Sequence, residues 1–326
     1  MASGTNQDGH ASSQDDHSPS PNSQAPQRRR SSFLSKTSSP LWRLLDPAEP
    51  WILTDEGSFL GYFDFVPREF RVGPWSAVAL VYLTVLFYVA ALACAYWCSE
   101  ASHPWWKLTR NFATDVAYPP LYSIQWYYHV SAAVWMFYVM VLVATGPLSY
   151  KAWSTYTIQS WTTLWVRHVL SALAPHYSWA LVGAEYLRFP VACSTTCTFG
   201  VWNVVLFPYT YWIALRGKPD KQQKFWEFNF SFRLVQIHVF NLAFLILNVY
   251  WASPQRPLEV MDFALALFSS IVYMAWYLMV LDRLGIHLYP VFSPRVWWLV
   301  IPMWTLLLTL YAATFGLWRW LLWPSE

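Results

Sequence analysis

Long stretches without a single charged residue dominate this sequence and restrict what it can fold into. Trp75–Cys98 runs for 24 residues without Asp, Glu, Lys or Arg, and about 20 apolar residues in a helix cross the hydrocarbon core of a bilayer. Only 12% of the chain is charged, whereas soluble domains carry about 25%. A soluble fold is therefore excluded, and the sequence predicts an integral membrane protein.

Seven such segments predict an all-α, polytopic bundle of about seven transmembrane helices. Aromatic residues crowd the ends of many of them, as they do at membrane–water interfaces. The third segment is the weakest, because Arg167 and His168 interrupt it. The predicted spans are Trp75–Cys98, Leu121–Thr145, Trp153–Ala174, Phe189–Leu215, Leu234–Trp251, Phe263–Leu281 and Val296–Trp318.

Two further segments precede the spans. Residues 1–40 are rich in Ser, Gln, Asp and Pro, so they bury too little apolar surface to offset chain entropy, and we expect a disordered tail. Residues 41–74 mix aromatic, charged and apolar side chains. We expect this second segment to lie at the membrane interface.

The distribution of Lys and Arg predicts the orientation. With seven spans, the N-terminal tail lies on the same side of the membrane as the loops that follow the second, fourth and sixth spans. These segments carry 15 Lys and Arg residues, and the segments on the opposite side carry 5. The positive-inside rule then places the N-terminus in the cytosol, in the endoplasmic reticulum, another endomembrane or the plasma membrane. The net charge of +3 is too small to indicate nucleic-acid binding.

Few polar groups fall within the predicted spans, and such groups are functional candidates because burying them in lipid is costly. The acids Glu185, Asp262 and Asp282 are expected at span ends or in loops. A proton- or cation-coupled carrier usually places a carboxylate at mid-depth, so this distribution argues against one.

A hydroxyl-rich stretch, Ser154–Ser160, opens the third span, and His238 lies four residues into the fifth. Both spans begin on the cytosolic side, and at 1.5 Å per residue Thr157 and His238 each lie roughly 6–8 Å into the bilayer. His168 lies roughly 16 Å deeper than Thr157, too far to take its proton. The hydroxyls also suit helix capping, and His287 is a competing base in a cytosolic loop.

Several blocks of residues 121–322 match a known pattern in order. They are Trp153-Ser-Thr-Tyr-Thr157, Phe189-Pro190 with Phe199-Gly-Val-Trp202, His238-Val-Phe-Asn241-Leu, and Gly285-Ile-His-Leu-Tyr289-Pro290-Val-Phe. They resemble the androgen-induced protein family, multi-span hydrolases that include the androgen-dependent regulator of tissue factor pathway inhibitor. The family has six spans, so residues 121–322 would form its core and residues 75–98 an additional N-terminal span.

The resemblance implies an activity and a site. Family members hydrolyse fatty acid esters of hydroxy fatty acids with a Thr nucleophile and a His, which fall on Thr157 and His238. Ser160 stands where the family has Asn or Asp, which leaves Thr155 as an alternate nucleophile. His287 stands where the family has Trp, which leaves open a different base or substrate.

The chemistry suits these residues, because a Thr hydroxyl becomes a nucleophile when a neutral imidazole takes its proton. Asn241, three residues after His238 and on the same helix face, would orient the ring or donate to the oxyanion. The expected partners are membrane lipids and a lipid ester substrate, with no cofactor and no metal. The alternatives are a non-catalytic lipid-binding or scaffolding protein and a small-solute carrier.

The four cysteines form two i,i+4 pairs, Cys94/Cys98 and Cys193/Cys197, at the non-cytosolic ends of the first and fourth spans. We interpret them as small packing residues. A disulfide between the two spans is the alternative.

Overall fold

The computed structural model describes residues 75–100, 117–146, 149–254, 256, 258–282, 289, 292–295 and 297–322. Contacts along the chain separate residues 1–39 from residues 40–326, and every described residue belongs to the second unit. The predicted tail and interfacial segment, residues 1–40 and 41–74, lie outside the described part.

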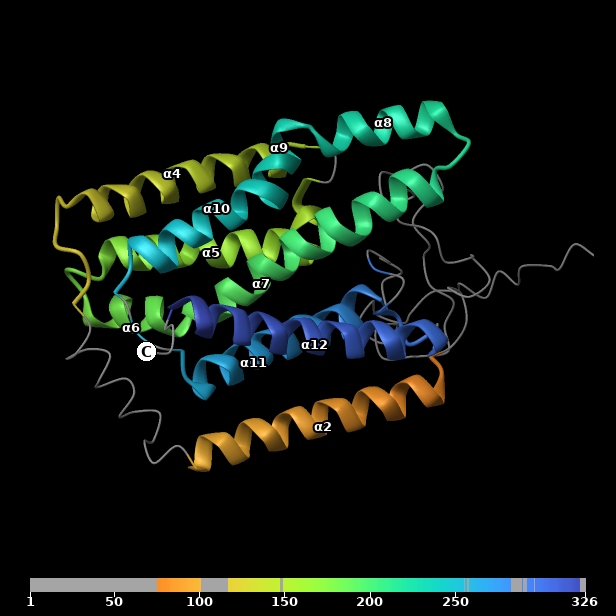
Figure 1. Ribbon diagram of the computed structural model, residues 1–326, viewed down its shortest axis with the longest axis horizontal. Helices are drawn as coiled ribbons and strands as arrows, with labels where there is room; N and C mark the ends of the chain where they lie inside the picture. Colours follow the sequence, from red (N-terminus) through yellow and green to blue (C-terminus); the bar gives the residue numbers. More distant parts are fainter. Residues whose placement is uncertain are drawn as a thin grey trace, which may run out of the picture. The chain divides into compact units, whose positions relative to one another are not determined.

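The secondary structure in the described ranges is helical and contains no strand, which confirms an all-α fold (Figure 1). Several helices continue directly into one another through short π-helical turns. The elements are α2 (Ala77–Glu100), α4 (Ile124–Ala144), η3 (Ser149–Ser154), α5 (Tyr156–Leu173), α6 (Ser178–Tyr186), α7 (Arg188–Gly200), η4 (Val201–Leu206), η5 (Tyr209–Ala214), α8 (Pro219–Asn229), α9 (Phe232–Val235), η6 (Gln236–Phe240), α10 (Asn241–Ile246), η7 (Leu247–Trp251), α11 (Val260–Trp276), η8 (Tyr277–Leu281) and α12 (Trp297–Leu322).

Five helical segments in the described ranges are long and apolar enough to cross a membrane. They overlap the second, fourth, fifth, sixth and seventh predicted spans, although the fourth begins at Ser178 instead of Phe189, so the chain is a multi-pass membrane protein. A count of seven stays a prediction, since α5 is not among the five and the described apolar part of α2, Ala77–Leu92, is shorter than a span. The five segments are Ile124–Ala144, Ser178–Ala214, Phe232–Trp251, Val260–Leu281 and Trp297–Leu322.

Helix α5 is packed on several sides, against α4, α6 and α7. Trp161, Leu164 and Phe189 are buried in the same apolar cluster, and the indole of Trp161 donates to the carbonyl of Met136 at 3.2 Å. One side of α5 is nevertheless polar, because Arg167 and His168 are also buried. This helix therefore sits in the protein interior rather than facing lipid all round.

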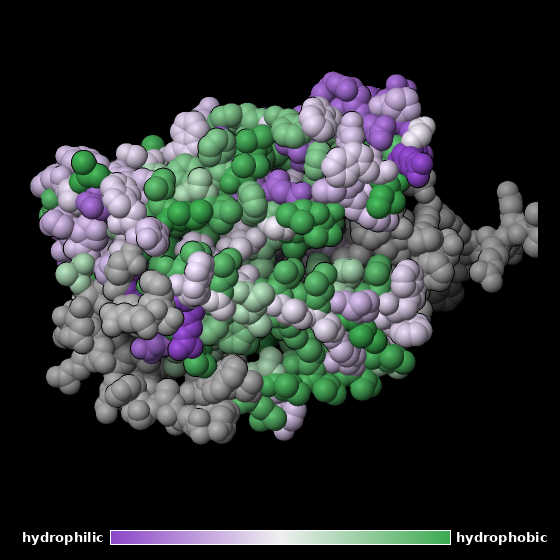
Figure 2. Space-filling model, in the orientation of Figure 1, coloured by the Kyte–Doolittle hydropathy of each residue, from purple (hydrophilic) through white to green (hydrophobic). Residues whose placement is uncertain are grey.

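The outer faces of the helices are apolar in the way that lipid contact requires. Val134, Phe137 and Tyr138 of α4 are all exposed. Apolar side chains cover the middle of the visible face, and hydrophilic side chains gather over α8 (Figure 2). Helix α8 carries Lys221 and Lys224, both exposed, which suits a segment that lies outside the hydrocarbon core.

Candidate functional site

The hydroxyl-rich segment forms the start of α5, and its members have different partners. Thr155 is the N-cap: its hydroxyl donates to the carbonyl of Ala152 at 2.7 Å and accepts from the backbone N–H of Ile158 at 3.3 Å. Both its proton and a lone pair are therefore engaged in capping. Thr157, in the first turn of the helix, has no part in the cap.

The hydroxyl of Tyr289 lies beside Thr157. It interacts with the side chain and the backbone of Thr157, and it accepts from the backbone N–H of Tyr156 at 3.2 Å. Burial raises the pKa of Tyr289 to about 12, although these hydrogen bonds lower the pKa in part. At neutral pH the Tyr289 hydroxyl therefore keeps its proton, and in its contacts with Tyr156 and Thr157 its oxygen is the acceptor.

His238 lies in η6, a π-helical turn of the segment Phe232–Trp251. Its side chain is buried, and its ring stacks on Trp202 with centroids 3.8 Å apart. In the part of the chain that the structure describes, Nδ1 of His238 has no hydrogen bond of ordinary length. The ring also interacts with the backbone of Leu234, four residues earlier.

Helix α5 and the segment that contains His238 lie side by side and pair in the same direction. Asn248 contacts His168, 80 residues earlier, at 3.2 Å, and Phe244 packs edge-on against Trp161, 83 residues earlier. Thr157 shares a helix face with Trp161 and His168, because positions four and eleven residues apart lie on one side of a helix.

Thr157 therefore lies on the face of α5 that carries Trp161 and His168, whose side chains contact the His238 segment. The common depth of Thr157 and His238 stays a prediction. No hydrogen bond joins the two side chains among the described contacts, so a substrate or a water would have to bridge them.

The other predicted site residues are engaged elsewhere. Asn241 accepts through Oδ1 from the backbone N–H of Leu242 at 2.7 Å. Ser160 lies within hydrogen-bonding distance of Ser194 (3.1 Å) and Thr195 (3.3 Å) on α7. His287 falls outside the described residues.

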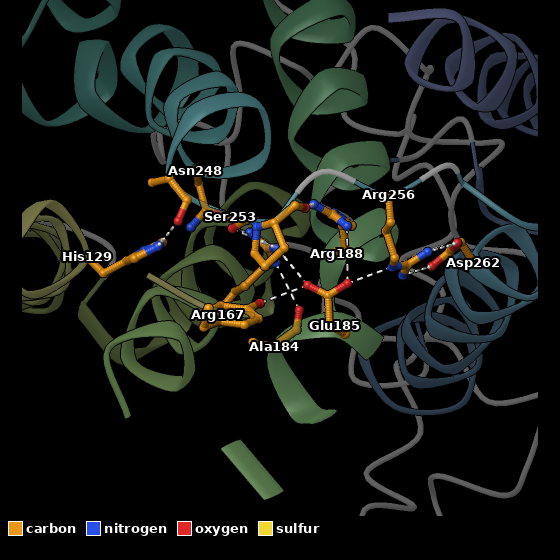
Figure 3. Close-up of polar contacts among 12 residues, drawn as sticks. His129, Arg167, Ala184, Glu185, Arg188, Asn248, Ser253, Arg256 and Asp262 are labelled. Carbon is orange, nitrogen blue, oxygen red and sulfur yellow. Dashed lines mark hydrogen bonds and ion pairs between the residues drawn. The ribbon is translucent and has the colours of Figure 1, made fainter. Parts of the chain in front are cut away.

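A denser polar cluster lies at the other end of α5, around Glu185 (Figure 3). The Glu185 carboxylate accepts from Arg188 at 3.2 Å, from Arg256 at 2.6 Å and from the hydroxyl of Tyr118 at 2.8 Å. Arg167 approaches the same carboxylate at 3.8 Å. The side chains of Arg167, Glu185 and Arg188 are completely buried.

Glu185 is the second-last residue of α6, near the start of the apolar helical segment Ser178–Ala214. The sequence contained one signal, the i,i+3 spacing of Glu185 and Arg188, which places opposite charges on one helix face. Their pairing with Arg167 and Arg256 depends on tertiary contacts that the sequence does not reveal.

Two buried histidines adjoin this cluster. His129 Nε2 lies 2.9 Å from the carbonyl of Ala252, and His129 Nδ1 lies 3.2 Å from His168 Nδ1. A carbonyl only accepts, so Nε2 of His129 carries the proton. In the neutral pair, His168 then donates from Nδ1 to His129, and the amide of Asn248 donates to His168 Nε2 at 3.3 Å.

In the described ranges, no group of three or more His, Cys, Asp or Glu side chains is placed to hold a metal ion. No family model, no curated protein and no solved structure matches this chain.

Proposed function

We propose that this multi-pass membrane protein hydrolyses lipid esters, namely fatty acid esters of hydroxy fatty acids or similar compounds, with Thr157 as nucleophile and His238 as base. The observation that supports the proposal is the packing of α5 beside the His238 segment, with Thr157 on the face of α5 whose side chains contact that segment. The rise per residue puts both residues at a similar depth, and a buried imidazole suits the role of base.

The reaction would proceed in two steps. His238 takes the proton of the Thr157 hydroxyl, directly or through one water, while Oγ1 attacks the ester carbonyl. The hydroxy fatty acid leaves with that proton, and the acyl group stays on Thr157. Water then attacks the acyl-threonine with His238 again as base, which releases the fatty acid and restores the hydroxyl.

Tyr289 completes this arrangement as a hydrogen-bond donor. Its protonated hydroxyl lies beside Thr157, where negative charge develops on the carbonyl oxygen during attack. A positioned donor of this kind stabilises the oxyanion.

Two sequence features accompany the proposal. The resemblance of residues 121–322 to the androgen-induced protein family carries the same Thr and His roles, and it suggests a six-span core with an N-terminal addition. The Lys and Arg distribution suggests a cytosolic N-terminus in an endomembrane or the plasma membrane.

Substitution of the two residues tests the proposal. Thr157→Ala and His238→Ala should each lower hydrolysis of a synthetic hydroxy-fatty-acid ester by about 10³-fold or more, and the double variant should be little worse, since the pair acts as a unit. Thr157→Ser should keep partial activity. Thr163→Ala is the matched control, because Thr163 lies on the same helix and donates to the carbonyl of Gln159.

Covalent labelling of the purified protein with a fluorophosphonate gives a second readout, because only an activated hydroxyl reacts. We expect labelling in the wild type and in Thr163→Ala, and none in Thr157→Ala. Wild-type hydrolysis by folded Thr157→Ala would refute the proposal. A wild type with neither turnover nor labelling would favour a non-catalytic lipid-binding protein.

A further inference from the structure

The cluster around Glu185 carries more positive than negative charge among the described residues. Three guanidinium groups, those of Arg167, Arg188 and Arg256, face two carboxylates, those of Glu185 and Asp262. Arg256 is shared, since it lies 2.6 Å from Glu185 and 2.7 Å from Asp262. Buried charges are stable only when they are paired and hydrogen-bonded, so each buried guanidinium nitrogen should have an acceptor.

The hydrogen bonds of Arg167 show where a partner is lacking. Nε donates to the carbonyl of Ala184 at 3.0 Å, and Nη2 donates to the hydroxyl of Ser253 at 3.2 Å. Nη1 has no partner in the described part of the chain, although the side chain is completely buried.

Arg188 has the same deficiency. Nη1 donates to Glu185 and Nη2 to the carbonyl of Pro254, while Nε is buried without a partner among the described residues. Buried donors are nearly always satisfied in native proteins. Two orphaned guanidinium nitrogens on neighbouring arginines therefore indicate an acceptor that the described residues do not supply.

The adjacent histidines do not fill this role. In their neutral form His129 and His168 satisfy each other, together with the carbonyl of Ala252 and the amide of Asn248. They carry no negative charge and therefore cannot neutralise a guanidinium group.

We propose that Arg167 Nη1 and Arg188 Nε bind the carboxylate of an acidic ligand at this end of the bundle. A carboxylate accepts well from guanidinium groups, and its two oxygens can accept one hydrogen bond from each arginine. The site is distinct from Thr157, which lies ten residues, or about 15 Å, away along α5.

A matched pair of probes tests the proposal on the full-length protein in detergent. Hexanoate and hexanamide have the same chain length and differ in charge, so isothermal titration calorimetry of both measures the contribution of the carboxylate. We expect saturable binding of hexanoate and at least about tenfold weaker binding of hexanamide, as charge-assisted hydrogen bonds imply. Acetate and inorganic phosphate serve as further probes.

Variants locate the binding. Arg167→Met and Arg188→Met should each remove the preference for hexanoate over hexanamide, whereas Arg319→Met, at an exposed arginine of α12, should leave it unchanged. Binding of acetate alongside hexanoate supports a site that recognises the carboxylate itself. Equal binding of hexanoate and hexanamide to the wild type would overturn the proposal, as would tighter binding of phosphate or no saturable binding of either carboxylate.

Discussion

The imidazole ring of His238 lies flat on the indole ring of Trp202, with the ring planes 4° apart. The indole is itself held, because its Nε1 donates to Oδ1 of Asn229 at 2.7 Å. The backbone carbonyl of His238 accepts from Asn203 at 2.8 Å. These contacts give the proposed base one orientation before any substrate arrives, which reduces the cost of reaching the reactive geometry.

Replacing Trp202 should therefore affect catalysis and stability together. Trp202→Ala removes the stacking partner and should cost about 3–5 kcal/mol in the free energy of unfolding, with a reduced kcat for ester hydrolysis. Trp202→Phe keeps an aromatic face but leaves Asn229 without its donor, so it should cost about 1–3 kcal/mol and retain more activity. Steady-state kinetics and SDS-titrated unfolding measure both effects. A folded Trp202→Ala variant with the wild-type kcat would show that the stack does not position the base.

The thiols of Cys193 and Cys197 are free and buried. We expect a maleimide reagent to label neither in the folded protein and both after denaturation, because the packed interior excludes the reagent. Peptide mapping by mass spectrometry measures the labelling at each position. A peptide that joins either residue to Cys94 or Cys98 in unreduced protein would restore the disulfide between the first and fourth spans.

Apolar length predicts the lipid-facing helices more strongly than it predicts α5, which lies in the protein interior. The spans recognised by apolar length have helices at the same positions, because lipid contact demands apolar side chains along the whole segment. Helix α5 lies within the third predicted span, Trp153–Ala174, which is the weakest of the seven because it contains Arg167 and His168. Both residues form polar contacts inside the protein. Such pairing depends on the tertiary structure, and hydropathy does not detect it.

The sequence predicts the depth of the candidate site in the membrane, but it does not predict which side chains surround the site. The rise per residue predicts that Thr157 and His238 lie at one level, and α5 packs beside the His238 segment. The stack on Trp202 and the approach of Tyr289 to Thr157 join segments far apart in the sequence. No local pattern encodes these contacts.

The orientation in the membrane calls for an engineered marker. The natural acceptor sequence, Asn229-Phe-Ser231, is a poor reporter because the Asn229 side chain is buried and accepts from Trp202. His176→Asn creates the acceptor Asn-Tyr177-Ser178 in an exposed turn after α5. Lys221→Asn with Gln223→Thr creates another on exposed positions of α8.

Expression of these variants in mammalian microsomes should give an endoglycosidase-sensitive shift for His176→Asn alone. This follows from the excess of Lys and Arg on the side of α8, which the positive-inside rule assigns to the cytosol. A shift for the α8 variant alone would invert the orientation, while Thr157 and His238 would still share one level.

The charge of Glu185 should be essential to the stability of the buried cluster. Glu185→Gln keeps the size of the side chain, but it removes the charge that Arg188 and Arg256 share and turns an acceptor into an amide donor facing them. Breaking a buried ion pair on one side leaves an uncompensated charge, so we expect a loss of about 3–5 kcal/mol in the free energy of unfolding. Glu227→Gln, at an exposed position of α8, is the matched control and should change stability by less than about 0.5 kcal/mol.

A double-mutant cycle separates the ion pair from general packing. Arg188→Met should cost less in the Glu185→Gln background than in the wild type, because the carboxylate that it would leave unpaired is already gone. SDS-titrated unfolding at neutral pH measures all four proteins. If Glu185→Gln were as stable as the wild type, or if the two costs were additive, the carboxylate would not be holding the arginines together. The cluster would then owe its stability to backbone acceptors such as the carbonyls of Ala184 and Pro254.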